Sequence, residues 1–390
     1  MTTWRWVDLG AVDGPTMVNV FVAVAGSVGS SKAPPTVIWL YPGAPFANVG
    51  FYQDADREID LEYCRQRGIP VVRRVVGGGA ILDGPWEQDY MVIVPAGSPG
   101  TTGGIPEFYE HYLRPVQGML SRLGIRAERS GVNDLAVGGR KISANGALFL
   151  DGSWVLVGDV LLDLDLESMN RILRVPDEKF RGKLAQNLDR HLTSVTRETG
   201  RLPDREALAS IFRQEFQSAL GVELVPGPLM KEETSRLESL RGERTQDSWT
   251  FQKEVAHPRL HPDLSAPGGP RTIKIAHGVH LGQVDRKVGK LLRVLLLSRD
   301  NRVEEVEISG DFFTEPFEGR LGELERGLAG CPLTEGDLSR AISTWQSRHS
   351  VRLIGISPED IVQALLDAAR PSPSISPTGP PGASPGNRAP

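Results

Sequence analysis

The sequence predicts an α+β fold, with a mixed sheet in a large first domain and a smaller α+β domain after it. Segments of strand length that are rich in β-branched and aromatic residues recur in the first part of the chain, and patterns of helical spacing lie between them. Residues 257–270, rich in proline and glycine, then separate this part from a second series of strands and helices. These observations predict two domains joined by a linker.

The elements expected in the first domain follow from local patterns. An amphipathic helix is expected over residues 106–125, because apolar residues recur there at spacings of three and four. Strands are expected at residues 36–41, 68–76, 89–97 and 153–166, and two surface helices at 183–200 and 204–222.

The second domain is expected to begin with strands and turns over residues 271–313. Three helices should follow, at residues 321–330, 335–345 and 357–369. Ser357 is a suitable helix cap, and Pro358 then occupies the first helical position. The expected division of the chain is a first domain at 1–250, a linker at 251–271, a second domain at 272–370 and a disordered tail at 371–390. The tail is expected to be disordered because it consists mainly of proline, serine and glycine and has no aromatic residue.

Composition excludes several classes of protein. The net charge of -5 gives no general attraction for nucleic acid, so no nucleic-acid partner is expected. Only two cysteines occur in 390 residues, without metal-ligand spacing, which argues against a disulfide framework and a zinc site of the cysteine type. Apolar runs fall short of the ~20 residues that a membrane-spanning helix needs. We therefore expect a cytoplasmic protein without a membrane partner.

The stretch VVRRVVGGGAIL, residues 71–82, interrupts an apolar strand with two arginines and three glycines. Alternation along a strand would place Arg73 and Arg74 on opposite faces. The glycines could form a turn whose backbone amides approach an anion, beside a guanidinium that binds phosphate or carboxylate. The alternative is a glycine-rich hairpin with exposed arginines.

A second motif, GVNDLAVGGRKISANGA, covers residues 131–147. Asn133 and Asp134 are turn-forming residues, followed by a short apolar strand and a glycine turn. Lys141 lies beside the apolar Ile142, and a lysine drawn towards a pocket generally needs an anionic partner. On an exposed edge strand the same lysine would be unremarkable.

Together the two motifs resemble the lipoate-protein ligases, part of a wider family that includes biotin protein ligases and octanoyltransferases. GFYQD at 50–54 is similar to an upstream element of that family, and residues 279–313 with LAGCPL at 328–333 resemble the accessory carboxy-terminal domain of lipoate ligases. The resemblance implies a biotin/lipoyl ligase-like catalytic domain followed by that accessory domain. Biotin ligases usually end in a smaller barrel, which makes them a poorer match.

The resemblance implies an ATP-dependent enzyme that activates lipoate or octanoate as an acyl-adenylate. The acyl group then passes to a lysine of a lipoyl-carrier protein, such as a glycine cleavage H-like protein. ATP and Mg²⁺ are the implied cofactors and lipoate the substrate. Lys141 would be the catalytic residue, contacting the α-phosphate and the acyl carbonyl, and Asp134 would act near the adenylate, in one hypothesis through Mg²⁺. The other implied nucleotide-site residues are Arg74, Gly77, Gly78, Gly79, Ala80, Ile81, Leu82 and Asn133.

The sequence departs from the family pattern around the expected acyl pocket. Val76 replaces a frequent serine, Asp83-Gly84 replaces a frequent His-Asp pair, and Val157-Gly158-Asp159 replaces His-Gly-Thr. One alternative is an octanoyltransferase that takes its acyl group from a carrier protein without ATP. Family members of that class use a cysteine nucleophile, and neither Cys64 nor Cys331 lies where it is expected. A second alternative is a catalytically silent protein that binds a lipoyl group or a nucleotide.

Overall fold

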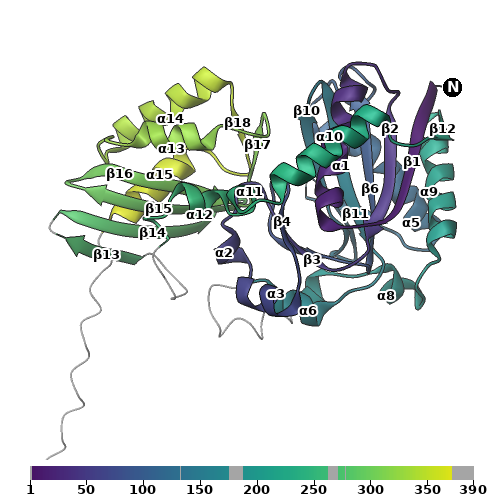
Figure 1. Cartoon of the computed structure of the whole chain (residues 1–390), viewed down its shortest axis with the longest axis horizontal. Coiled ribbons are helices and arrows are strands. Elements are labelled where there is room, and N and C mark those ends of the chain that lie inside the picture. Colours follow the sequence, from purple (N-terminus) through teal and green to yellow (C-terminus); the bar gives the residue numbers. More distant parts are fainter. Residues whose placement is uncertain (1, 132, 175–187, 262–270, 277, 371–390) are drawn as a thin grey trace, which may run out of the picture.

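The computed structural model describes residues 2–131, 133–174, 188–261, 271–276 and 278–370 (Figure 1). Residues 262–270 of the expected linker, the expected disordered tail and the start of the helix expected at 183–200 lie outside the described residues. Among the described helices, none is long and apolar enough to span a membrane.

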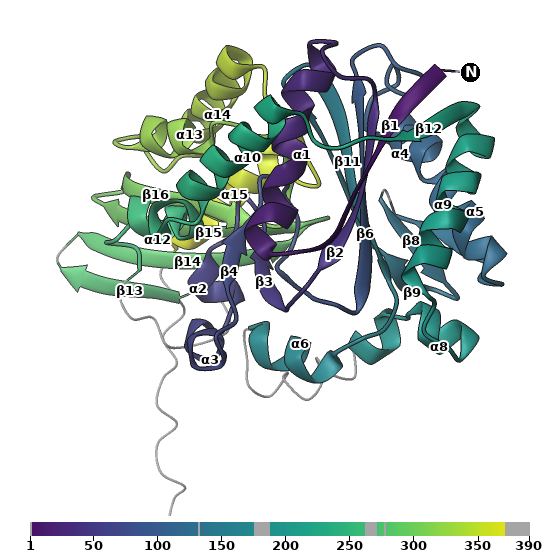
Figure 2. The same cartoon turned by 45° about the vertical axis from the view of Figure 1, so that its right-hand side comes forward.

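A six-stranded mixed sheet forms the centre of the first domain (Figure 2). Its strands lie in the order β10-β11-β6-β2-β1-β12. Strand β1 runs parallel to its neighbours β2 and β12, and β6 runs antiparallel to β2 and β11. The strands are β1 (Thr2–Val12), β2 (Thr36–Pro42), β6 (Glu87–Pro95), β10 (Asn145–Leu150), β11 (Ser153–Leu161) and β12 (Val222–Pro226).

Alternation of side chains along these strands divides the core into two layers. On β6, Tyr90 and Val92 belong to the apolar cluster under α4 (Ile105–Tyr112), α5 (Arg114–Arg122) and α9 (Arg205–Leu220). Met91 and Ile93 belong to the cluster on the opposite face, under α1 (Gly14–Gly29) and α10 (Lys231–Arg244). The sheet is therefore covered by helices on both faces (Figure 2).

Two small sheets carry the motifs of the sequence analysis. One has the order β4-β3-β5 and the other β7-β8-β9. Their strands are β3 (Phe46–Val49), β4 (Val71–Arg73), β5 (Ile81–Asp83), β7 (Glu128–Ser130), β8 (Asp134–Val137) and β9 (Arg140–Ser143). The short helices of this domain are α2 (Ala55–Glu58), α3 (Leu61–Arg67), α6 (Leu166–Ile172) and α8 (Val195–Thr199).

The structure corrects three expected elements. The helix expected at 106–125 is divided into α4 and α5, because Pro115 has no N–H to donate to the preceding turn. The strand expected at 68–76 contains only β4, since the chain turns away after Arg73 into the glycine loop. Within the expected helix 183–200, α8 is a short separate helix that begins after its cap, Ser194.

The second domain consists of an antiparallel sheet of β13 (Arg271–Ala276), β14 (Val279–Lys287), β15 (Leu291–Arg299) and β16 (Arg302–Gly310). Three helices pack against this sheet: α13 (Leu321–Leu328), α14 (Glu335–His349) and α15 (Pro358–Ala369) (Figure 1). A separate pair joins β17 (Phe313–Glu315) to β18 (Arg352–Ile354). The start of α15 is confirmed, because the Ser357 side chain accepts a hydrogen bond from the Asp360 N–H and Pro358 is the first helical residue.

The second domain packs on the first through α12 (Gln252–Ala256), which follows α11 (Asp247–Thr250), and through the loop after β3. The Tyr52 hydroxyl lies 2.6 Å from Thr314 Oγ1, and the Tyr52 ring stacks on Phe312 at 4.9 Å. Arg293 of β15 donates to Glu58 at 2.9 Å. These contacts place β17 beside the glycine loop of the first domain.

Candidate functional site

Arg73 anchors the start of the glycine loop from inside the protein. Its side chain is fully buried, and it donates to backbone carbonyls of two separate segments, at Gly50, Phe51, Gln53, Trp249 and Thr250. Such bonds to a charged group contribute about 1.5–3 kcal/mol each. Arg73 therefore joins the loop after β3 to α11, and the alternative of a hairpin with exposed arginines does not hold.

Arg74 stabilises the glycine loop itself. Its guanidinium donates to the carbonyl oxygens of Asn48, Gly77 and Gly79, at 3.1, 3.0 and 2.8 Å. Burial lowers its pKa to about 10, so it stays charged at neutral pH. The arginine expected to hold a phosphate is thus already bonded to the carbonyls of its own loop.

The three glycines of the loop have different surroundings. Gly78 has a φ of +96°, a backbone conformation that favours glycine. A Cβ atom at Gly77 would lie 2.6 Å from the Phe312 carbonyl oxygen and 2.8 Å from the Phe313 ring, whereas one at Gly79 would meet nothing within 4 Å. The close approach at Gly77 is therefore to the second domain of the same chain.

Two adjoining cavities lie beside this loop. One, of about 370 Å³, is lined mainly by apolar side chains of both domains, among them Val75, Ile105, Tyr109, Leu148, Phe313 and Ile354. The other, of about 340 Å³, is called the polar cavity here because more charged side chains line it, and it includes the loop glycines, Arg74 and Lys141. Both linings share Val76, Gly77, Asn133, Asp134, Lys290 and Phe313. The first cavity suits an apolar chain and the second a polar reacting group.

Lys141 lines the polar cavity, beside Asp134, which lines both cavities. Its Nζ atom is 2.7 Å from Asp134 Oδ2, across the hairpin formed by β8 and β9. Gly138 and Gly139 turn this hairpin, and both have positive φ. The lysine thus has the anionic partner that a lysine near a pocket needs, supplied by the same motif.

Of the remaining predicted site residues, some line a cavity and others pack beside it. Asn133 lines both cavities, and its side chain donates to the Asn145 carbonyl while the Asn145 amide donates back to the Asn133 carbonyl. Ile81 lines the polar cavity. Ala80 and Leu82 line neither cavity, contrary to expectation, because they pack in the apolar cluster between α3 and α6.

Buried carboxylates, not predicted as site residues, also line the polar cavity. Burial raises the pKa of Asp83 to about 6 and that of Asp159 to about 7, and it holds the pKa of Asp89 well above its ordinary value. Asp159 accepts a hydrogen bond from the Ala144 N–H at 2.8 Å. Two of these residues, Asp83 and Asp159, occupy positions where the sequence departs from the family pattern, which was the signal that could have found them.

The charges of the polar cavity do not favour a polyphosphate. Its described lining includes the carboxylates of Asp83, Asp89, Asp134, Asp159 and Asp311 and the cations of Arg74, Lys141 and Lys290. Arg74 and Lys141 are already paired. A triphosphate would therefore meet more acidic side chains than basic ones, and two of the basic ones are already bonded within the protein.

Neither cysteine belongs to the site. Cys64 is buried on α3 in a separate apolar cluster, and Cys331 lies in the second domain at the edge of another pocket. Burial raises the pKa of the Cys64 thiol to about 11 and also raises that of Cys331. Both are therefore protonated at neutral pH and are poor nucleophiles.

Comparison with known families and structures identifies the first domain. The family model described as the lipoyl protein ligase A/B catalytic domain matches residues 25–217. The chain therefore carries a lipoyl protein ligase A/B catalytic domain. The matched segment begins within α1, ends within α9 and contains both motifs. The resemblance seen in the motifs is confirmed.

Curated relatives of this domain are octanoyltransferases. "Octanoyltransferase LipM" of Kyrpidia tusciae is 28% identical over 275 residues, covering 65% of this chain and 100% of the relative. LipM of Geobacillus kaustophilus is 27% identical, covering 64% of this chain and 98% of that protein. The prediction of an ATP-dependent, acyl-adenylate-forming ligase is therefore wrong, because the relatives are named as transferases.

Solved structures share the fold. The bipartite lipoate protein ligase of Thermoplasma acidophilum matches 64% of this chain and 97% of its own, with a TM-score of 0.56 and 21% identity. Lipoate-protein ligase A bound with ATP matches 64% and 99%, with a TM-score of 0.55 and 19% identity. LipL1 of P. falciparum, in complex with lipoate, matches 89% and 98%, with a TM-score of 0.62 and 11% identity. The last match extends over both domains.

Proposed function

We propose that this protein transfers an octanoyl group from a carrier-protein thioester to a lysine of a lipoyl domain, without ATP. The observation that carries the proposal is that an apolar cavity and a polar one adjoin at Asp134, which pairs with Lys141 of the polar cavity. The names of the curated relatives support octanoyl as the group transferred. A lipoyl domain as acceptor is supported by the Thermoplasma acidophilum neighbour, which is described together with its E2 lipoyl domain.

The apolar cavity would bind the hydrocarbon chain. Its volume of about 370 Å³ lies in the range of about 300–1,000 Å³ that is common for small-molecule sites. Each buried methylene contributes about 0.8 kcal/mol, so chain length should strongly affect binding. Phe313 and Ile354 of the second domain close one side of this cavity, so the octanoyl chain would be enclosed between the domains.

The transfer step would take place at Lys141. The acceptor's lysine ε-amine attacks the thioester carbonyl carbon, a C–N bond forms, and negative charge develops on the carbonyl oxygen. The Lys141 ammonium, held by Asp134, stabilises that charge. The C–S bond then breaks, and the carrier thiol leaves with the proton that the amine gives up. Asp159, whose pKa burial raises to about 7, is suited to relay this proton at neutral pH.

The transfer is direct, from thioester to amine. No enzyme thiol takes part in it, because both cysteines of the chain lie outside the two cavities. A direct transfer requires carrier and acceptor on the enzyme together. The expected kinetics are therefore sequential rather than ping-pong.

The experiment supplies two donors separately. Full-length protein and an isolated lipoyl domain are incubated with octanoyl-carrier protein alone in one reaction, and with free octanoate, ATP and Mg²⁺ in the other. The mass of the lipoyl domain is then measured by intact mass spectrometry. We expect octanoylation from the thioester and none from octanoate. Octanoylation only with ATP would overturn the proposal, and no octanoylation from either donor would instead favour a catalytically silent binding protein.

A further inference from the structure

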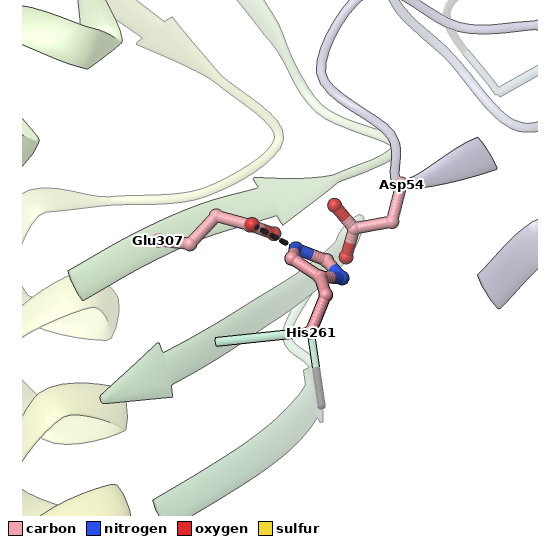
Figure 3. Close-up of side chains that lie close together, drawn as sticks. All are labelled: Asp54, His261 and Glu307. Atoms are coloured by element: carbon pink, nitrogen blue, oxygen red, sulfur yellow. Dashed lines mark hydrogen bonds and ion pairs between the residues drawn. The ribbon is translucent and has the colours of Figure 1, made fainter. Parts of the chain in front are cut away.

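A cluster of metal-ligand side chains lies away from the candidate active site, at the boundary between the two domains. Asp54, His261 and Glu307 lie with their polar atoms directed toward one another (Figure 3). Asp54 precedes α2 in the first domain, His261 follows α12, and Glu307 belongs to β16 of the second domain. One potential ligand atom from each residue lies within 4.8 Å of the other two.

The cluster is buried and incompletely bonded. Asp54 and Glu307 have no exposed surface, and the His261 side chain is 8% exposed. Within the described part of the chain, Asp54 Oδ1 and Glu307 Oε1 are buried atoms without a hydrogen-bond partner, and the nearest partner of His261 Nδ1 is the Asp56 carboxylate at 3.5 Å. A buried carboxylate oxygen left unpaired typically costs about 1–3 kcal/mol or more. Two such oxygens beside an imidazole nitrogen indicate that the site is suited to a ligand.

Neighbouring cations only partly balance these carboxylates. Arg57 Nε lies 3.6 Å from Asp54 Oδ2, and Arg293 Nη1 lies 4.0 Å from the same oxygen. Arg293 is nearer to Glu58 and Asp285, at 2.9 and 3.0 Å. On the other side, Asp56 Oδ2 lies 3.5 Å from His261 Nδ1 and adds a further negative charge.

Two hydrogen bonds hold the cluster in place. Ser309 Oγ donates to Asp54 Oδ2 at 3.1 Å, and His261 Nε2 lies 2.7 Å from Glu307 Oε2. The first bond comes from outside the cluster, whereas the second joins two of its members. The Ser309 bond is therefore an outer hydrogen bond of the kind that orients metal-binding carboxylates.

We propose that Asp54, His261 and Glu307 bind a divalent transition-metal cation of the Zn²⁺ class. An imidazole nitrogen with two carboxylate oxygens suits Zn²⁺ better than Mg²⁺ or Ca²⁺, which take oxygen ligands. Zn²⁺ bonds to these donors at about 2.0–2.2 Å, so small side-chain rotations within the cluster are sufficient. The ion would replace the direct contact between His261 and Glu307.

The bound ion would fasten the second domain to the first. Glu307 lies on the strand that leads into Asp311 and Phe313, which line the cavities beside the glycine loop. Metal binding at the boundary would therefore stabilise the arrangement in which Phe313 contacts Gly77. The site itself does not depend on the function proposed above, because none of its ligands lines either cavity.

The test uses full-length, tag-free protein stripped of metal with a chelator. Zn²⁺ is titrated against a competing indicator, and bound zinc is counted by elemental analysis after gel filtration. We expect about one ion per chain and a rise in the melting temperature on adding Zn²⁺. His261→Ala and Glu307→Gln should each lose both effects, while their circular dichroism stays that of the wild type.

Two matched variants control for general effects. His280→Ala removes a histidine of β14, and Glu304→Gln neutralises a carboxylate of β16 that pairs with Arg259 and Arg299. Both should bind Zn²⁺ as the wild type does. Absence of zinc binding by the wild type, or equal binding by His261→Ala and Glu307→Gln, would overturn the proposal and leave a hydrogen-bonded carboxylate and imidazole cluster only.

Discussion

The ammonium of Lys141 lies 2.7 Å from Asp134 Oδ2, on paired strands of one hairpin, and Asp134 lines both the apolar and the polar cavity. Removing this charge should abolish most of the transfer activity. In Lys141→Met the side chain keeps its length and loses the group that stabilises the carbonyl oxygen, so kcat should fall by about 10²–10³-fold. Lys32→Met, at an exposed lysine outside the cavities, is the control and should keep wild-type kcat. Equal rates for both variants would show that the reaction occurs elsewhere.

Gly77 and Gly79 offer a matched pair within the loop. A methyl group at Gly77 would press on the Phe312 carbonyl and the Phe313 ring, whereas one at Gly79 has open space. Gly77→Ala should therefore lower the free energy of unfolding by about 1–3 kcal/mol, and Gly79→Ala should leave it nearly unchanged. Chemical denaturation of the two variants measures this difference. The expectation fails if both are equally stable.

The length of the acyl chain should be set by the apolar cavity. Ala147 is nearly buried and lines that cavity. In Ala147→Leu the larger side chain occupies space that the hydrocarbon would use, so octanoyl transfer should weaken by about fourfold for each methylene excluded. Transfer of a butyryl group should change little, which makes the ratio of the two kcat/KM values the measurement. A uniform loss for both chains would place the hydrocarbon elsewhere.

The pH dependence of stability should report the buried carboxylates. Burial raises the pKa of Asp159 from 3.8 to about 7, so between these pH values the folded protein holds a proton that the unfolded chain has lost. Stability therefore falls as pH rises through this range, by about 1.4 kcal/mol for each unit of raised pKa. Asp159→Asn can still accept from the Ala144 N–H and avoids this loss. Its melting temperature should match that of the wild type near pH 4 and exceed it at pH 8.

The same variant tests the proposed proton relay. If Asp159 takes the proton of the attacking amine, the wild-type transfer rate should rise between pH 6 and 8 as this carboxyl ionises. In Asp159→Asn that rise should disappear while octanoyl binding is retained. An unchanged pH profile would assign the proton transfer to another group.

Much of the fold is readable from local sequence pattern. Strands β2, β6 and β11 stand out because valine, isoleucine and aromatic residues gather there at strand length. Helix α1 does not, because its run VNVFVAVAG is rich in β-branched residues and buried on nearly every side, so it has neither helical spacing nor helical composition. The division at Pro115 depends on one missing N–H, which hydrophobic spacing does not reveal.

The sequence predicts only those site contacts whose two residues belong to the same motif. Lys141 and Asp134 are close in sequence and meet across a two-glycine turn, so their pairing follows from the hairpin. Phe313 and Lys290 reach the same cavities from the second domain, through packing that no local pattern indicates. Arg74 could be read as a phosphate ligand from sequence, and only its bonds to Gly77 and Gly79 reveal a supporting role.

Direct acyl transfer at Lys141 is the central claim, and intact mass spectrometry of a Cys64→Ser/Cys331→Ser double variant tests it most directly. Octanoyl-carrier protein is added first without acceptor, and the lipoyl domain is added afterwards. The account predicts no octanoyl adduct on the enzyme in the first step, and octanoylation of the lipoyl domain at the wild-type rate in the second. A cysteine-linked adduct on the wild type, together with an inactive double variant, would contradict it.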